Sequence, residues 1–226
     1  MEERRESFRT SIPTRHLPLA AICILLSASA GAAPAALGSV PATVSLTPAL
    51  IGQRLALLAG TAALTALVEE LVFRGVLLQA LLRALPRTRA LLASALLFAL
   101  PHALPIGLGS TEAAPDMPVA TLSLGLKLAQ AFAFGIIMAS VAAPHDHVRA
   151  SGLAIAVVLH SLYDALYFAP AVLATGAFPA TYITAQPGEL AALAASTLLL
   201  APAAVKALRS NPPSFLREAM QENTTA

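Results

Sequence analysis

The chain has 226 residues, of which 57% are hydrophobic and only 12% are charged, with a formal net charge of +2. A soluble domain carries about 25% charged residues, so the composition excludes a soluble globular protein, and the apolar content excludes intrinsic disorder. A net charge this small gives no reason to expect a nucleic-acid partner. The single cysteine, Cys23, excludes an internal disulfide and a cysteine-rich zinc site.

The composition predicts an all-α fold, a polytopic membrane helical bundle with six transmembrane helices. Each apolar span is near the ~20 residues that a helix needs to cross the hydrocarbon, except the third, which is short. The sequence shows no repeat and no second domain, so we expect one intramembrane domain over residues 1–226. In chain order, the predicted spans are residues 17–37, 54–82, 90–104, 120–143, 151–168 and 189–208.

The first span also has features of a cleavable secretory signal. Basic residues precede an apolar run at residues 17–26, and the small residues 27–30 follow it, which is the order of regions in a signal peptide. A retained first helix and a removed signal both stay open. The rest of the topology is the same in either case, because the connection that follows is external.

Between the spans, Lys and Arg occur only in alternate connections, and one of the connections without them carries Glu112 and Asp116 instead. Basic residues favour the cytoplasmic side of a membrane. The sequence therefore predicts a multi-pass protein of a bacterial-type cell inner membrane with both termini in the cytoplasm. The basic residues that set this orientation are Arg4, Arg5, Arg9, Arg15, Arg83, Arg87, Arg89, Arg149, Lys206, Arg209 and Arg217.

The second span contains three ionisable residues, Glu69, Glu70 and Arg74, with apolar residues on both sides. Each charge at a helix centre costs about 2.5–3.5 kcal/mol on insertion scales, so such residues need a partner or a function. Glu70 and Arg74 are spaced i,i+4 and can pair on one face, whereas Glu69 is rotated by ~100° and is the carboxylate left for chemistry. The alternative is a helix end that reaches the cytoplasm with both acids solvated.

Two further spans carry ionisable residues at a similar depth: His102 in the third, after Pro101, and the i,i+4 pair His160 and Asp164 in the fifth. Counted from the cytoplasmic ends at ~1.5 Å per residue, Glu69 is ~20 Å deep, His102 ~18 Å and His160 ~14 Å. Matched depths on three helices predict one polar cavity near the middle of the membrane. The alternatives are a histidine that bonds a neighbouring helix and a self-contained His160–Asp164 pair.

Other polar residues are predicted to have no catalytic role. Lys127 lies near the outer end of the fourth span, where a lysine can extend its ammonium group to the interface. The residues His145, Asp146 and His147 form a short cytoplasmic loop, for which we expect solvation rather than metal binding, since a zinc site needs more ligands.

Taken together, the polar motifs resemble the CAAX protease and bacteriocin-processing family of intramembrane proteases, which includes the Ras-converting-type CAAX prenyl endopeptidases. The resemblance covers about residues 60–170. The chain departs from the family pattern at Asp164, where Asn is usual, and it has fewer spans than larger members. The motifs, in order, are Glu69-Glu70-x-x-x-Arg74, Phe98-x-x-x-His102 and His160-x-x-x-Asp164.

The resemblance implies an endopeptidase, and the residues allow a mechanism without a metal. Glu69 then acts as the general base toward a water molecule that His102 also holds. His160 and Asp164 lie where the developing oxyanion needs donors. An ionised Asp164 cannot donate a hydrogen bond, so it would orient His160 instead. The Glu70–Arg74 pair holds the helix face in place.

A metal-dependent mechanism is the alternative. In it, Glu69, His102 and His160 bind a Zn²⁺ ion and leave one position open for water. Asp164 favours this version, because a carboxylate can support a ligating histidine. We favour the version without a cofactor.

We therefore expect an intramembrane endopeptidase that hydrolyses a membrane-anchored protein or a C-terminal tail, with the lipid bilayer as its other partner. A prenylated CAAX-type protein, a bacteriocin precursor and a sorting tail all remain open as substrates. The alternative function is a non-enzymatic membrane immunity or partner-binding protein, in which the charged cluster joins helices. An ion-coupled transporter is disfavoured, because transporters are typically built from repeats.

Overall fold

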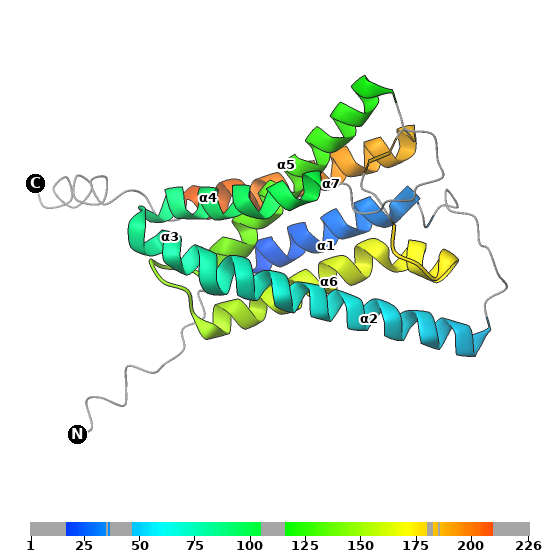
Figure 1. Cartoon of the computed structure of the whole chain (residues 1–226), viewed down its shortest axis with the longest axis horizontal. Helices are drawn as coiled ribbons and strands as arrows, with labels where there is room; N and C mark the ends of the chain where they lie inside the picture. The colour runs from blue at the N-terminus through cyan, green and yellow to red at the C-terminus, as the bar shows by residue number, and fades with distance from the viewer. Residues whose placement is uncertain are drawn as a thin grey trace, which may run out of the picture.

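The computed structural model describes residues 17–34, 36, 47–104, 116–179, 183–184 and 186–209, and this part of the chain is helical and contains no strand. The predicted all-α helical bundle is therefore confirmed (Figure 1). The helices are α1 (Leu17–Pro34), α2 (Pro48–Glu70), η3 (Leu71–Leu78), α3 (Gln79–Ala84), α4 (Arg87–Ala99), η4 (Leu100–Ala103), α5 (Met117–Ala142), α6 (Ala150–Thr175) and α7 (Pro187–Arg209).

Within the described residues, five helices are long and apolar enough to cross a membrane: α1, the continuous rod from Pro48 to Ala84, α5, α6 and α7. The predicted third span is the exception. It forms α4, which has 13 residues and a length of ~20 Å, short of the ~30 Å hydrocarbon core. Pro101 lies in the 3₁₀ turn η4 that follows α4, as expected of a residue that cannot continue an α-helix.

The rod that carries Glu69 and Glu70 is longer than predicted and changes its winding at these residues. It begins at the cap Thr47, whose side chain accepts a hydrogen bond from the backbone N–H of Leu50 at 3.2 Å, with Pro48 in the first turn. Directly after Glu70 the α-helix becomes the π-helix η3. Such segments are rare and often mark functional sites.

The helices pack so that the segments carrying the ionisable residues meet. The α2 part of the rod packs against α6. Helix α4 packs against α5, which also packs against α6 and α7. The contact between α4 and α5 needs a glycine: a Cβ atom at Gly135 would lie 3.0 Å from the Cα atom of Ala95. Small residues of this kind let membrane helices approach closely.

Helix α1 is an integral part of the bundle. It packs against α7 and α6 (Figure 1), and its Ser27 hydroxyl lies 2.7 Å from the hydroxyl of Ser196 on α7. Both hydroxyl groups are buried. Removal of α1 as a signal peptide would expose this face of α6 and α7, while cleavage itself stays a prediction that the fold does not test.

The basic residues in the connections between helices, where the structure describes them, lie at one end of the bundle. The start of α1, the start of α4 and the end of α7 meet there, together with the turn between α5 and α6. The tail arginines Arg4, Arg5, Arg9, Arg15 and Arg217 lie outside the described residues. The helix arrangement thus brings the remaining basic residues to the same end, as the predicted topology requires.

Candidate active site

Glu70 and Arg74 form the buried ion pair that their spacing predicts. Arg74 Nη1 lies 3.0 Å from Glu70 Oε1, and both side chains have 0% exposure. The guanidinium group also stacks over the ring of Phe98, 4.2 Å from its centroid, and Nη2 donates to the carbonyl of Gly135 at 3.4 Å. The pair therefore joins the rod to α4 and α5.

Glu69 and Glu70 have different environments although they are neighbours. The side chain of Glu69 is 32% exposed, whereas that of Glu70 is fully buried. The alternative in which both acids are solvated is therefore wrong for Glu70. Arg74 lies within the π-helix η3 that begins directly after these residues.

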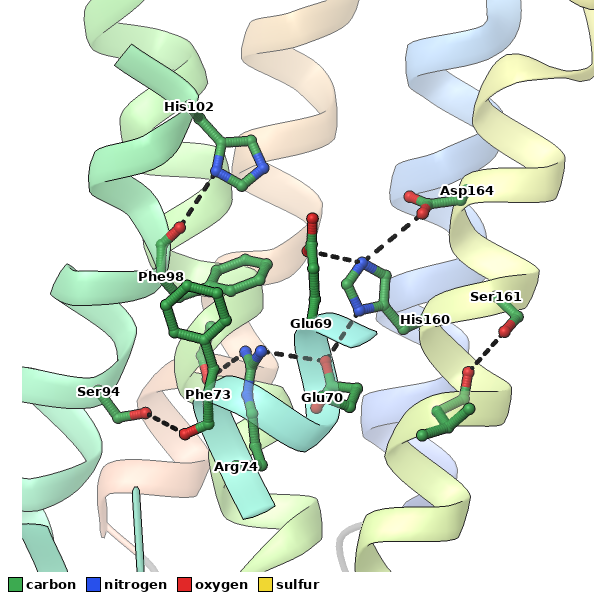
Figure 2. Close-up of polar contacts among 12 residues, drawn as sticks. Glu69, Glu70, Phe73, Arg74, Ser94, Phe98, His102, His160, Ser161 and Asp164 are labelled. Atoms are coloured by element: carbon green, nitrogen blue, oxygen red, sulfur yellow. Dashed lines mark hydrogen bonds and ion pairs between the residues drawn. The ribbon is translucent and has the colours of Figure 1, made fainter. Parts of the chain in front are cut away.

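His160 on α6 is surrounded by three carboxylates (Figure 2). Its Nδ1 lies 2.8 Å from Glu70 Oε1, and its Nε2 lies 3.7 Å from Glu69 Oε2 and 3.7 Å from Asp164 Oδ2. His160 and Asp164 are therefore not the self-contained pair that the spacing allowed. Glu70 serves two partners, since the same oxygen contacts both Arg74 and His160.

His102 lies in the 3₁₀ turn η4 at the end of α4. Its Nδ1 is 3.1 Å from the carbonyl oxygen of Phe98. A carbonyl only accepts hydrogen bonds, so this contact requires a proton on Nδ1, and the neutral ring then has its lone pair on Nε2. The ring of His102 also packs 5.2 Å from that of Phe98, centroid to centroid.

All four predicted catalytic residues, Glu69, His102, His160 and Asp164, line one cavity of about 130 Å³. The predicted convergence of residues from three helices is therefore confirmed. The space is large enough for ordered water, which needs about 10–15 Å³ and polar partners. Aromatic residues form much of the remaining wall: Phe98, Phe134, Tyr163, Tyr167, Phe168 and Phe178.

The predicted outward course of Lys127 is wrong. Lys127 is buried and lines the same cavity, and its ammonium group donates to Gln130 Oε1 at 2.9 Å and lies 5.3 Å from the Tyr167 ring centroid. Gln130 in turn donates to Ser196 Oγ at 2.5 Å. Lys127 and Gln130 are spaced i,i+3 and share a helix face, which was the signal in the sequence for this network.

The alternative zinc site lacks an assembled set of ligands. Zinc–nitrogen bonds are about 2.0–2.1 Å long and zinc–oxygen bonds 2.0–2.2 Å. Because His160 contacts Glu70 through Nδ1 at 2.8 Å, Nε2 is the nitrogen that could face an ion. Across the described ranges of the chain, no group of three or more His, Cys, Asp or Glu side chains could hold a metal ion. That includes the loop with His145 and His147.

Comparison with known proteins identifies a family for this chain. A family model described as Rce1-like, type II CAAX prenyl endopeptidase, matches residues 51–166, which is half of the chain. This range contains the rod with Glu69 and Glu70, His102, and the part of α6 with His160 and Asp164. Neither the curated proteins nor the solved structures contain a match to the chain.

Proposed function

Because the chain belongs to the Rce1-like family of type II CAAX prenyl endopeptidases, we propose that the cavity around Glu69 hydrolyses a peptide bond of a membrane-associated substrate. The observation that carries the proposal is that Glu69, His102, His160 and Asp164, from three separate helical segments, line one cavity of about 130 Å³. Charged groups within membrane segments are costly and mark functional sites.

In the proposed mechanism, Glu69 is the general base that removes a proton from a water molecule. Glu69 is partly exposed and has no contact with Arg74, so its carboxylate is available to accept the proton. The lone pair on Nε2 of His102 accepts a hydrogen bond from the same water, which orients the water for attack on the carbonyl carbon. A positioned general base contributes about 10²–10⁴-fold to the rate.

His160 is proposed to stabilise the oxyanion that forms on the attacked carbonyl. Glu70 is paired with Arg74 and accepts the hydrogen bond from His160 Nδ1. Nε2 can then donate only when the ring is protonated, because a neutral imidazole carries one proton. Glu69 and Asp164, each 3.7 Å from Nε2, favour this protonated form by their negative charge. A single oxyanion donor is worth about 2.7–4 kcal/mol in similar sites.

Lys127 is proposed to balance the negative charge in the cavity. Glu69 and Asp164 both line it, and Arg74 is already engaged with Glu70. A buried ammonium group across the same space lowers the cost of having two carboxylates close to a developing oxyanion. The aromatic wall increases this effect, since charges interact more strongly where water is excluded.

The variant Lys127→Met is expected to lower the turnover number by about tenfold, while Asp164→Asn in the same background recovers part of that loss. When two residues belong to one network, the free-energy effect of substituting both commonly differs from the sum of the single effects by about 0.5–3 kcal/mol. Steady-state kinetics of the two single variants and the double variant measure this coupling. Arg209→Met, at the exposed end of α7 and in the lining of neither cavity, is the control. Additive effects of Lys127→Met and Asp164→Asn would contradict the charge balance.

We propose the metal-free mechanism in preference to the metal-dependent one. In the alternative, Glu69, His102 and His160 would hold a Zn²⁺ ion, which would polarise the substrate carbonyl and activate water. In that version, Glu69 and His160 Nε2, which lie 3.7 Å apart, would be ligands of the same ion. The contact between Nδ1 and Glu70 would then serve to orient a ligand.

We also propose that the basic end of the bundle faces the cytoplasm of a bacterial-type cell, since Lys and Arg favour that side. A reporter that is active only outside the cytoplasm is expected to be active when fused after residue 109 and inactive when fused after Thr88. A reporter that is active only in the cytoplasm is expected to give the reverse. If the same reporter is active at both fusion positions, the two positions lie on the same side of the membrane, which would contradict this orientation.

The proposed activity is tested with purified protein in bilayer vesicles and a quenched fluorescent peptide that ends in a prenylated CAAX-type sequence. Cleavage by the wild type and none by His102→Ala supports the proposal. An identical peptide without the prenyl group tests whether the substrate must be lipid-modified. If cleavage of every peptide is the same for the wild type and His102→Ala, the hydrolytic role of this cavity is refuted.

A further inference from the structure

The bundle contains a second cavity, at its basic end and separate from the catalytic one. Its volume is about 160 Å³, and its walls come from the start of α1, the ends of α5 and α7, and the starts of α4 and α6. We propose that this cavity binds the phosphate group of an anionic phospholipid. The catalytic residues play no part in this proposal, which therefore stands apart from the proposed peptidase activity.

The charge of the second cavity suits an anion. Three basic residues line it, Arg87, Arg149 and Lys206, together with His145, and among the described residues of its lining none is Asp or Glu. Asp146 follows His145 in the same turn and interacts electrostatically with Arg87, although it does not belong to the lining. A concave surface lined by one sign of charge raises the local concentration of ions of the opposite sign.

Arg87 is positioned as an anion-binding residue. Its Nε donates to the carbonyl of His145 at 3.3 Å and its Nη2 donates to the carbonyl of Ala143 at 2.9 Å. These bonds hold the guanidinium group against the turn between α5 and α6. Its Nη1 is buried and has no hydrogen-bond partner within the described part of the chain. A buried donor without an acceptor is unfavourable, and a phosphate oxygen would supply the acceptor.

The turn that carries these carbonyl groups is closely packed. A Cβ atom at Gly152 would lie 2.5 Å from the carbonyl oxygen of Val141, so only glycine lets the start of α6 approach the end of α5 this closely. The backbone N–H of Arg149 also donates to the carbonyl of Ala142 at 3.0 Å. The wall of the cavity is therefore held in shape by backbone contacts.

The remaining lining favours a lipid over free phosphate. Beside the basic residues and two serines, Ser140 and Ser151, the wall is mostly apolar and includes Leu17, Ile137, Val141 and Ile155, which could contact an acyl chain. The cavity lies where the helices begin and end, and we expect the ends of membrane-spanning helices to lie near the lipid headgroups. Basic pockets between membrane helices on the cytoplasmic side are suited to anionic headgroups.

The test is native mass spectrometry of the full chain from vesicles of phosphatidylglycerol or of phosphatidylcholine. We expect the wild type to retain phosphatidylglycerol preferentially, and Arg87→Gln and Lys206→Gln each to weaken that retention about fivefold. Arg89→Gln, on the same helix but outside the lining, is the matched control and should match the wild type. Arg87→Gln could also weaken retention by disturbing the turn whose carbonyl groups Arg87 binds. Lys206→Gln is included because it leaves those hydrogen bonds in place.

Three outcomes would overturn the lipid site. The first is equal retention of both lipids by the wild type. The second is equal loss of phosphatidylglycerol in Arg89→Gln and Lys206→Gln, which would indicate general charge attraction. The third is saturation by inorganic phosphate in detergent without lipid, to the same extent and with the same response to Lys206→Gln. That third result would identify a free-phosphate site.

Discussion

The variant Glu69→Gln is expected to lose about 10²–10⁴-fold in cleavage rate while keeping its fold. Glutamine has nearly the same shape as glutamate, but its amide cannot accept the proton of the attacking water. The fold should tolerate the change, because the side chain is 32% exposed and its nearest charged contact with His160 is 3.7 Å long. Cleavage kinetics and the thermal unfolding midpoint of the purified protein measure the two effects separately.

Glu189→Gln is the matched control for this variant, since it makes the same chemical change at a glutamate that does not line the catalytic cavity. It should retain wild-type activity. A chelator should also leave cleavage by the wild type unchanged. Full inhibition by a chelator, reversed by added Zn²⁺, would contradict the metal-free mechanism and favour the alternative in which Glu69 is a ligand.

The variant Arg74→Ala is expected to destabilise the protein by about 3–5 kcal/mol, because it leaves Glu70 as a buried charge without its partner. Both side chains have 0% exposure, and Glu70 Oε2 already has no hydrogen-bond partner within the described ranges. For a chain of this size the thermal midpoint should fall by roughly 6–20 °C. Arg83→Ala, an exposed arginine of the same rod, should change it little.

A double variant separates the two roles of Glu70. Arg74→Ala combined with Glu70→Gln removes the stranded charge and should recover much of the lost stability. Activity should stay low, because glutamine can accept the hydrogen bond from His160 Nδ1 but lacks the negative charge that Glu70 places 2.8 Å from it. A double variant as unstable as Arg74→Ala alone would show that Arg74 acts mainly through Phe98 and the carbonyl of Gly135.

The local parts of the site could be predicted from the sequence. Glu70 and Arg74 are four residues apart on one helix, so helical geometry alone brings them together. The convergence of Glu69, His102 and His160 on one cavity was also predicted from distances along helices. These predictions succeed because they depend on the rise per residue and not on how the helices pack.

The parts that depend on packing could not be predicted. Glu70 and His160 are 90 residues apart, and only the contact between α2 and α6 brings them together. Lys127 was expected to reach the interface, but its direction is set by the position of α5 within the bundle. The second cavity left no pattern in the sequence, because its walls come from the ends of five helices.

The most direct test of the central claim is a comparison of membrane proteins from cells that express the wild type or Glu69→Gln in place of it. Mass spectrometry of terminal peptides measures where each protein ends. If the cavity hydrolyses a peptide bond, at least one membrane-associated protein should be shortened with the wild type and full-length with Glu69→Gln at equal expression. A strain in which the gene is deleted serves as the reference for full-length proteins. If the same membrane proteins are shortened in cells with the wild type and in cells with Glu69→Gln, the catalytic role of Glu69 is contradicted.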